Sequence, residues 1–405
     1  MEKLKNSAFD FSSKLRQTSV VERFKDYLVW QRSIRLTDNS NKPPDFAPIS
    51  INLDLTSACN FACPHCVDSE IINLGKSLDL EDVKKTLNVL QARGLLSVIL
   101  IGGGEPTLHR SFEEIALFIK DKGLQLGIVT NGSRLEKIEK IASALDKGDW
   151  VRLSLDAASQ DTFEKTHLPK KKIFFKDILT KAQNIKKSNP DISLGYSFVI
   201  VWDGVFLNGK RLYPNIGEMA DAVKLAAEYS FDYVSFKPCL VRLKDSHKES
   251  LLDISEKEKE KKIIFDIKQN LKQAKQASLG SIKLLESVNL QAIVDNKVDE
   301  LKRQPKTCHM HFFNTVVTSA GIFHCPAFRG VDNARLADPC GYCDQKLFDE
   351  TLNSTANSLK NFNAKKECGI VGCFYHHVNW WVEDFICSDK KISELSTVEN
   401  DNFFF

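Results

Sequence analysis

The sequence of 405 residues predicts an α/β fold, namely a partial (β/α)6 TIM-like barrel followed by a Cys-rich C-terminal domain. Two observations support this fold class. From about residue 49 onward, short apolar runs alternate with longer amphipathic runs, which is the pattern of parallel strands joined by helices. Glycines, polar residues or cysteines directly follow most of the apolar runs, and a barrel gathers its active residues at the carboxyl ends of its strands.

Six apolar runs are expected to form the strands of the barrel, and five amphipathic runs are expected to form the helices between them. The strands are expected at residues 50–55, 96–102, 124–130, 150–156, 193–201 and 231–238. The helices are expected near residues 79–93, 111–122, 134–146, 175–188 and 216–229. Six such units over about 190 residues predict a barrel that is incomplete.

The whole chain exceeds the size at which a single hydrophobic core usually stops growing, so several segments are expected. They are an N-terminal helical extension (1–48), the partial barrel (49–240), a helical linker (241–304), a Cys-rich domain (305–390) and a C-terminal tail (391–405). The linker interleaves acidic and basic residues, which predicts a solvated helical face. The stretch "NTVVTSAGIFHC" predicts a hairpin, and metal is expected to stabilise the Cys-rich domain. The three phenylalanines that end the tail either dock or are accidental.

Composition points to a soluble protein with an unremarkable surface charge. The sequence is 42% hydrophobic and 27% charged, and its formal net charge is +3. It contains no signal peptide and no run near the roughly 18 apolar residues of a membrane span, so we expect a cytoplasmic protein without a membrane partner. The charge balance gives no footprint for a nucleic-acid partner. Eleven cysteines in a reducing compartment predict metal ligands or redox groups more than disulfides.

Three cysteines lie close together in "TSACNFACPHCVD", directly after the first expected strand. Spacers of three and two residues separate Cys59, Cys63 and Cys66. Three thiolates suit a 4Fe-4S cluster whose fourth iron stays open to a substrate or cofactor. Zinc is the alternative, but a structural zinc needs four ligands, and His65 would have difficulty closing a tetrahedron beside Cys66. The triplet alone leaves both metals, and chance, open.

A Gly-Gly-Glu turn follows the second expected strand, at Gly103, Gly104 and Glu105. Together with the cysteine triplet, this turn resembles the radical S-adenosylmethionine (SAM) superfamily, over residues of about 50 to 240. The resemblance implies that the three thiolates hold a 4Fe-4S cluster and that SAM chelates its open iron. The glycines would let the backbone approach the methionine moiety, and Glu105 would accept a hydrogen bond from its ammonium group.

The same resemblance implies further positions that bind SAM, and it implies a reaction. Ser154 and Asp156 match positions that commonly bind the ribose or the carboxylate, and Asn131 is a weaker candidate. The implied reaction is reductive cleavage of SAM to methionine and a 5'-deoxyadenosyl radical, which abstracts a hydrogen atom from the substrate. The cofactor carries the difficult chemistry and the protein aims the radical. A flavodoxin or ferredoxin-type protein is the expected electron donor.

A second group of seven cysteines resembles the C-terminal extension called SPASM, or its shortened twitch relative, which carries one or two auxiliary 4Fe-4S clusters. The seven are Cys308, Cys325, Cys340, Cys343, Cys368, Cys373 and Cys387. Two spacings depart from the family: three residues separate Gly321 from Cys325 where four are usual, and 24 separate Cys343 from Cys368. The seven thiols therefore serve one complete cluster plus a three-Cys cluster, or one cluster plus packing cysteines. A zinc knuckle at Cys340 and Cys343 is the alternative.

The other histidines of this region, and one isolated cysteine, have less specific interpretations. The histidines are His309, His311, His324, His376 and His377, and each is expected to be a polar neighbour more than a ligand. Cys239 follows the sixth expected strand, where the radical would form. Its weak S–H bond makes it a candidate hydrogen donor, as in certain radical SAM epimerases. The alternative is a buried cysteine that packs as a small hydrophobe.

The predicted function is that of a radical SAM oxidoreductase or epimerase-type enzyme that oxidises, epimerises or cross-links a small metabolite or sugar. Maturation of a ribosomally synthesised peptide is an alternative. Only about 48 residues precede the first expected strand, too few for the leader-binding module that peptide modifiers often carry, so small molecules are favoured. A non-catalytic iron-sulfur scaffold or redox sensor is a further alternative, and the intact Glu105 turn argues against it.

Overall fold

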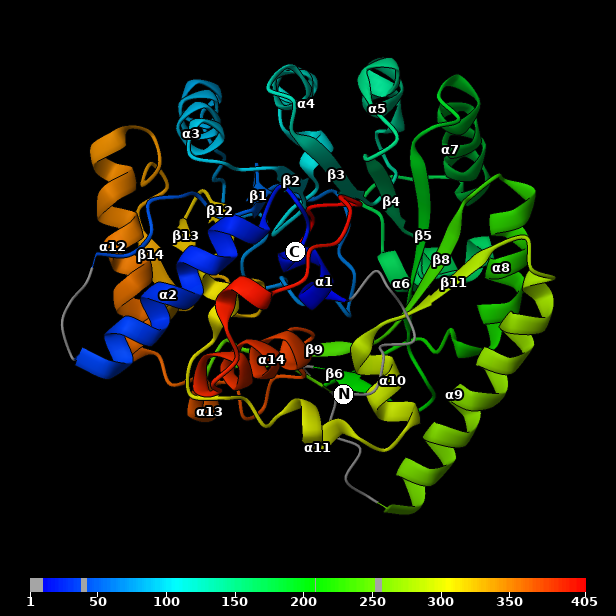
Figure 1. Ribbon diagram of the computed structural model, residues 1–405. Coiled ribbons are helices and arrows are strands. Elements are labelled where there is room, and N and C mark those ends of the chain that lie inside the picture. Colours follow the sequence, from blue (N-terminus) through cyan, green and yellow to red (C-terminus); the bar gives the residue numbers. More distant parts are fainter. Residues whose placement is uncertain (1–9, 38–41, 208, 252–256) are drawn as a thin grey trace.

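A ten-stranded sheet forms the centre of the computed structural model, which describes residues 10–37, 42–207, 209–251 and 257–405 (Figure 1). Its strand order is β11-β8-β5-β4-β3-β2-β1-β12-β13-β14. The six predicted barrel strands are β1 (Ser50–Asp54), β2 (Ser97–Leu100), β3 (Gln125–Thr130), β4 (Trp150–Ser154), β5 (Ser193–Ile200) and β8 (Tyr233–Pro238). They are parallel and adjacent in chain order, which confirms the predicted partial barrel.

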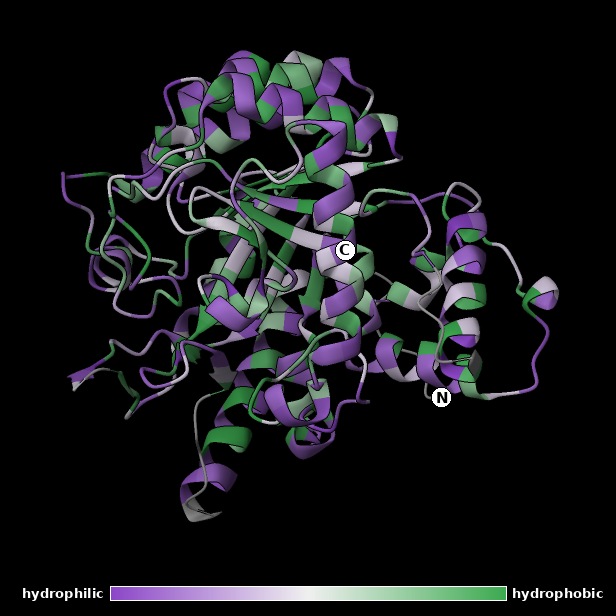
Figure 2. Ribbon diagram, turned by 90° about the vertical axis from the view of Figure 1, so that its left-hand side faces the viewer, coloured by the Kyte–Doolittle hydropathy of each residue, from purple (hydrophilic) through white to green (hydrophobic). Residues whose placement is uncertain are grey.

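Helices cover the outer face of the sheet (Figure 1). They are α3 (Leu80–Ala92), α4 (Phe112–Asp121), α5 (Leu135–Ile141), α7 (Phe175–Ser188) and α8 (Met219–Glu228), and all five match predicted helices. Figure 2 shows hydrophobic and hydrophilic residues mixed along these helices, as expected for helices with one face on a core. Helix α6 (Gln160–His167) was not predicted. Its N-cap Ser159 accepts a hydrogen bond from the Thr162 N–H, and it ends where Leu168 adopts a left-handed conformation.

Side chains along each strand alternate between the two faces of the sheet, and in β4 the residues of the inner face are less completely buried than those of the helix-covered face. In β4, Val151 and Leu153 are completely buried, whereas Trp150, Arg152 and Ser154 keep partial exposure. Successive side chains of a strand point to opposite faces, so these three residues share the face away from the helices. Arg152, level with Tyr233 on β8 across Gly195 of β5, therefore lies inside the barrel.

The sheet continues beyond the six predicted strands at both edges. At one edge β12 (Asn314–Thr318) pairs in parallel with β1, and β13 (Gly321–Phe323) and β14 (Arg335–Ala337) follow in antiparallel fashion. The predicted hairpin is thus confirmed as β12 and β13, and it belongs to the barrel sheet. At the other edge, β11 (Lys283–Glu286) pairs in parallel with β8.

The linker was expected to be helical throughout, and this prediction was wrong in part. It contains α9 (Lys257–Ser278), α10 (Val288–Val294) and α11 (Val298–Leu301), but also β10 (Glu249–Leu251) and β11. Strand β10 forms a short hairpin with β9 (Leu240–Arg242), and β6 (Phe206–Leu207) forms another with β7 (Lys210–Arg211). A charged composition hid these strands, because short strands with at most one buried residue carry little apolar periodicity.

The N-terminal and C-terminal ends of the described chain pack against each other. The N-terminal segment forms α1 (Phe11–Leu15) and α2 (Val21–Thr37), and the C-terminal segment forms α12 (Gln345–Asn361), α13 (Ala364–Glu367) and α14 (His376–Cys387). The tail docks through its last residues: the ring of Phe404 lies 5.3 Å from that of Trp150, and the Ser97 hydroxyl donates to the Phe403 carbonyl. Trp150 and Ser97 begin their strands, so the tail closes the amino-terminal end of the barrel.

None of the helices in the described ranges is both long enough and apolar enough to cross a lipid bilayer.

The docked tail is expected to stabilise the fold. Phe404→Ala should lower the free energy of unfolding by about 3 kcal/mol, because it removes a buried ring and leaves a cavity beside Trp150. Urea denaturation of the full chain measures this change. Phe174→Ala is the matched control, since Phe174 is 52% exposed. Equal stability of Phe404→Ala and the wild type would show that the docked tail contributes nothing.

Candidate active site

The loop that follows β1 carries Cys59, Cys63 and Cys66. Backbone bonds shape it: the Cys59 N–H donates to Asn73 Oδ1 (2.9 Å), and the Cys66 N–H donates to the Cys63 carbonyl (3.1 Å). Burial raises the pKa of Cys63 well above its usual range, and negative charge on Cys66 and Asp156 raises it further. Burial also raises the pKa of Cys66 to about 12. Thiolates at these positions therefore need the positive charge of a bound metal.

The sulfurs of the cysteine loop can be compared with the ligand atoms of a single metal ion. Two sulfurs on one zinc ion lie about 3.8 Å apart, since each Zn–S bond is about 2.3 Å. Across the described ranges, the one set of three His, Cys, Asp or Glu ligand atoms within 4.8 Å of one another is Asp82, Cys340 and Cys343. Within the described ranges, Cys59, Cys63 and Cys66 do not form such a set, so the loop does not hold their sulfurs at the spacing of a single-ion site.

The Gly-Gly-Glu turn after β2 packs directly on the cysteine loop. A Cβ atom on Gly104 would lie 2.4 Å from the Thr56 carbonyl oxygen and 2.5 Å from that of Ala58, so only glycine fits there. The Glu105 N–H donates to the Ala58 carbonyl (2.8 Å), and the Gly103 N–H donates to Asp54 (3.3 Å). Backbone contact at this site thus joins the turn to the loop that presents the thiols.

The Glu105 side chain is buried and accepts several hydrogen bonds. Its Oε1 accepts from the Thr107 and Thr130 hydroxyls, and its Oε2 accepts from the Asn131 N–H (2.6 Å). Burial raises the pKa of Glu105, while these donors favour its charged form. The carboxylate therefore ties the turn to the end of β3. Oε2 has one such bond and retains capacity to accept another, as an ammonium acceptor requires.

The other residues predicted to contact SAM lie at neighbouring strand ends. Ser154 is the last residue of β4 and is partly exposed on the inner face. Asn131 follows β3, and its side-chain amide donates to Asn60 in the cysteine loop (2.9 Å). Asp156 adopts a left-handed backbone conformation, and its carboxylate contacts His65 Nε2 (3.0 Å). His65 therefore binds a carboxylate.

Sequence reasoning missed His167, which lies behind the cysteine loop at the end of α6. Its Nδ1 is 3.1 Å from Cys63 Sγ, and its Nε2 is 2.8 Å from the Leu155 carbonyl. A carbonyl only accepts, so Nε2 carries the proton and Nδ1 faces the thiol. Burial lowers the pKa of His167 to about 4, which keeps the ring neutral. His167 was missed because its helix, α6, was not predicted from the sequence.

Two basic residues inside the barrel were also missed, namely Arg152 on β4 and Lys237 on β8. Burial lowers the pKa of Lys237 to about 7, the positive charge of Arg152 lowers it further, and Asp156 partly offsets this. Within the described ranges no ion pair is found for either residue. The Arg152 guanidinium lies over the Trp150 ring (5.2 Å), and its Nε is buried without a hydrogen-bond partner. Their alternation in strands marked them as inward-facing, but their proximity depends on the register of β4, β5 and β8.

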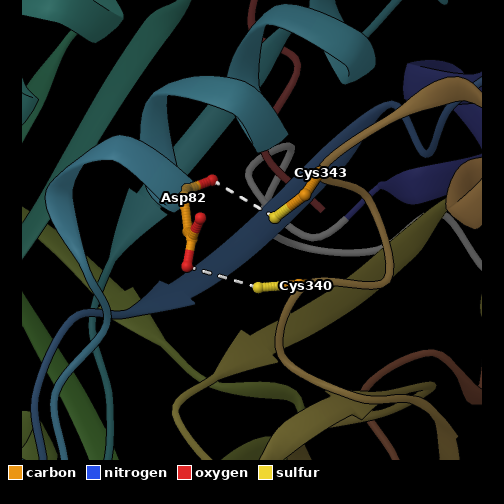
Figure 3. Close-up of side chains that lie close together, drawn as sticks. All are labelled: Asp82, Cys340 and Cys343. Atoms are coloured by element: carbon orange, nitrogen blue, oxygen red, sulfur yellow. Dashed lines mark hydrogen bonds between the residues drawn. The ribbon is translucent and has the colours of Figure 1, made fainter.

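The structure divides the seven C-terminal cysteines into groups. Cys308 and Cys368 are buried, and Cys325 and Cys373 are half-buried. Burial, followed by repulsion from other members of this group, raises the pKa of Cys325, Cys368 and Cys373. Cys340 and Cys343 lie apart, against Asp82 of α3 (Figure 3). Cys387 is exposed at the end of α14, where Arg35 Nη1 lies 3.3 Å from its sulfur. Four thiols thus meet in one place and three do not.

The histidines near these cysteines have varied surroundings. His309 lies between the Tyr27 hydroxyl (2.7 Å) and the Glu383 carboxylate (2.9 Å). The rings of His311 and His324 stack with centroids 3.7 Å apart, and both are buried. The His376 and His377 rings, near the start of α14, lie 5.1 Å apart, and Gln304 lies 3.2 Å from His376. Cys239, directly after β8, is completely buried and its sulfur donates to the Leu240 carbonyl.

A buried charge network lies between the two cysteine regions. Arg329 contacts Asp54 at the end of β1 (2.7 Å) and Asp68 beyond the cysteine loop (3.2 Å). Arg242 of β9 contacts Asp68 (3.0 Å) and Glu249 of β10 (3.4 Å). Burial raises the pKa of Asp54 to about 7 and that of Glu249 to about 7, although the arginines oppose the shift. The network joins the barrel, the loop and the C-terminal segment.

Arg329 is expected to be essential for this arrangement. Arg329→Met should lower the free energy of unfolding by about 3–5 kcal/mol, because it leaves buried carboxylates without a counter-ion. Arg335→Met is the control, since Arg335 is exposed and its pair with Asp338 should contribute about 1 kcal/mol or less. Chemical denaturation of both variants provides the comparison, and equal losses would contradict a special role for the buried network.

Comparison with known proteins identifies the family of the barrel. The model of the radical SAM superfamily matches residues 53–206. An S-adenosylmethionine-dependent nucleotide dehydratase of Selenomonas ruminantium is 34% identical over 113 residues, which are 28% of this chain and 40% of that protein. Mycofactocin maturase MftC of Mycolicibacterium smegmatis is 32% identical over 117 residues, which are 28% of this chain and 29% of that protein. The chain thus spans less than half the length of these two relatives.

Solved structures share the fold over most of the chain. Streptococcus suis SuiB bound to its precursor peptide SuiA superposes with a TM-score of 0.54 at 13% identity, covering 90% of this chain and 93% of that one. The anSMEcpe protein with bound AdoMet and the Cp18Cys peptide gives a TM-score of 0.51 at 17% identity, covering 82% and 88%. The cysteine loop and the Gly-Gly-Glu turn both lie within residues 53–206, so this part of the chain is a radical SAM domain, a type of domain that binds a 4Fe-4S cluster and SAM.

Proposed function

We propose that this radical SAM enzyme modifies a peptide substrate, by oxidation, epimerisation or cross-linking. The observation that carries the proposal is the assembly of the three-thiol loop, the Glu105 turn and a separate enclosed group of four cysteines around one barrel. The mycofactocin maturase relative supports a maturase, and the peptide complexes of SuiB and anSMEcpe suggest peptide as the substrate class. This reverses the preference for a small metabolite that the sequence alone favoured.

The residues of the cysteine loop and its neighbours have distinct proposed roles. Cys59, Cys63 and Cys66 would hold three irons of the cluster, and the bound cluster and SAM supply a 5'-deoxyadenosyl radical. Glu105 holds the turn, and its Oε2 would accept a hydrogen bond from the ammonium group of SAM. Asp156 holds His65 and with it the loop between Cys63 and Cys66.

Ser154, at the end of β4, and Asn131, which anchors the loop through Asn60, are proposed to contact the SAM ribose or carboxylate. Gly103 and Gly104 admit its methionine moiety to the loop. These contacts position SAM against the inner face of the barrel. The protein thereby orients the cofactor and limits access of water to it.

The second cysteine group is proposed to hold one auxiliary 4Fe-4S cluster. Cys308, Cys325, Cys368 and Cys373 provide the four thiolates that such a cluster uses, and all four are largely shielded from solvent. Held by these thiolates, such a cluster would supply an acceptor for the electron released when a substrate radical is oxidised. A flavodoxin or ferredoxin-type protein is the proposed donor to the SAM cluster. Cys239 remains a candidate hydrogen donor, on the condition that substrate binding exposes its buried thiol.

A small anionic metabolite is the second candidate substrate, because of Arg152 and Lys237. Two basic side chains without ion-pair partners face the same interior, beside the strand end that carries Ser154 and Asp156. A phosphate or carboxylate would neutralise both. The nucleotide dehydratase relative is consistent with a phosphorylated substrate.

Cys59→Ala is expected to abolish formation of 5'-deoxyadenosine, because loss of one thiolate removes a ligand of the SAM cluster. Anaerobic reconstitution with iron and sulfide, followed by chromatographic quantification of 5'-deoxyadenosine with SAM and dithionite, measures the effect. Cys387→Ala is the control and should retain wild-type formation, since Cys387 is exposed and distant in the chain from the loop. Wild-type levels in Cys59→Ala would refute the assignment.

Stimulation of 5'-deoxyadenosine formation distinguishes the substrate classes. The reconstituted wild-type protein should respond to the peptide fraction of a host extract and lose this response when the fraction is digested with protease. Response to a protease-resistant small-molecule fraction would favour the anionic metabolite. A protein with a full iron load that forms no 5'-deoxyadenosine with either fraction would favour the iron-sulfur scaffold.

A further inference from the structure

We propose that Asp82, Cys340 and Cys343 form a site for a single metal ion of the zinc class, which fastens the C-terminal segment to helix α3 of the radical SAM domain (Figure 3). Nothing in the proposed radical chemistry uses these residues. Cys340 Sγ lies 3.4 Å from Asp82 Oδ2, and Cys343 Sγ lies 3.7 Å from the Asp82 carbonyl oxygen. The three ligand atoms lie within 4.8 Å of one another, although Cys340 follows Asp82 by 258 positions in the sequence.

Local structure holds both cysteines in place before any metal binds. The Cys343 N–H donates to the Cys340 carbonyl (2.8 Å), which closes a tight turn between β14 and α12. A Cβ atom on Gly341 would lie 2.5 Å from the Ala337 Cβ, and the Thr351 hydroxyl donates to the Gly341 carbonyl (2.7 Å). The turn is thereby packed between a strand and a helix. Rigid supporting elements of this kind favour a defined metal geometry.

The third ligand is fixed by the first turn of α3. Asp79 caps this helix by accepting from the Glu81 N–H (2.9 Å), so the helical turn that carries Asp82 is well defined. The Thr86 hydroxyl, one turn further along, lies 3.6 Å from Cys343 Sγ. Lys85 contacts Asp82 (3.3 Å) but is 59% exposed, so its side chain can move to solvent when a cation binds. Helix α3 thus presents one carboxylate to two thiols.

The ligand set selects the class of metal. Two thiolates and one carboxylate suit zinc, which accepts both sulfur and oxygen, whereas calcium and magnesium bind oxygen. A structural zinc takes four ligands, so a water molecule must supply the fourth beside these three protein ligands. The short distances between ligand atoms match one ion, and the wider cysteine groups of this chain do not meet that criterion. The site therefore differs in kind from the proposed clusters.

A metal here would strengthen an interface that is otherwise polar. At the opposite end of α3, Arg93 packs its guanidinium over the Phe348 ring (4.7 Å) and lies 3.7 Å from Asp349, both on α12. Asp82 and the cysteine turn form the second point of contact between α3 and this part of the chain. An ion at that point would lock the angle between the barrel and the C-terminal segment.

Metal analysis of the complete, iron-loaded protein tests the site. Plasma mass spectrometry should find about one zinc per chain, and zinc X-ray absorption should show two sulfur ligands at about 2.3 Å together with oxygen ligands. Cys340→Ser/Cys343→Ser should lose the zinc and keep its iron. Asp82→Asn should release zinc to a chelator far more readily than the wild type. Glu81→Gln and Cys387→Ser are the matched controls and should keep wild-type zinc.

Several results would overturn the proposal. Loss of iron in Cys340→Ser/Cys343→Ser would make these cysteines cluster ligands, and a disulfide between them in zinc-free protein would make them a redox pair. Zinc bound by three or four sulfurs, or unchanged zinc retention in Asp82→Asn, would exclude the carboxylate. Because zinc content is measured apart from 5'-deoxyadenosine formation, this outcome does not depend on the radical chemistry.

Discussion

The buried ion pairs of the Arg329 guanidinium are the interaction on which the rest of the site depends. The guanidinium lies 2.7 Å from Asp54 at the end of β1 and 3.2 Å from Asp68 beyond the cysteine loop. Charges this deeply buried are stable only when they are paired, so the barrel strand, the loop and the C-terminal segment must be placed together. Arg242 extends the pairing to Glu249, and three carboxylates then share two arginines.

This network borders both cysteine regions, which gives it a part in the electrostatics of each. Negative charge on Asp68 contributes, after burial, to the raised pKa of Cys66. Glu249 acts in the same way on Cys325, on the other side of the network. Acidic side chains of the network therefore lie between two groups of thiols and oppose the ionisation of Cys66 and Cys325. Binding of metal at either group would relieve this repulsion, and folding and metal binding are coupled through it.

The sheet explains why the C-terminal segment lies so close to the barrel. β12 pairs with β1 along its full length, in register from Ser50 with Asn314 to Asp54 with Thr318. The hairpin that leads to Cys325 is thus an extension of the barrel, and Asp54 ends the shared pair. The tail adds a second constraint, because Phe404 packs against Trp150 at the opposite end of the barrel. One sheet therefore carries the cysteine loop with the Gly-Gly-Glu turn and orients the second cysteine group.

Local sequence was sufficient for the barrel elements and the SAM loop, because strand and helix periodicity, the spacing of Cys59, Cys63 and Cys66, and the Glu105 turn are all short-range features. It did not separate the seven C-terminal cysteines, since spacing cannot show that Cys340 turns toward Asp82 while Cys308 faces inward. The pairing of β12 with β1, the contact of His167 with Cys63 and the burial of Arg329 were equally invisible. These depend on register and packing between residues far apart in the chain, which only the tertiary structure decides.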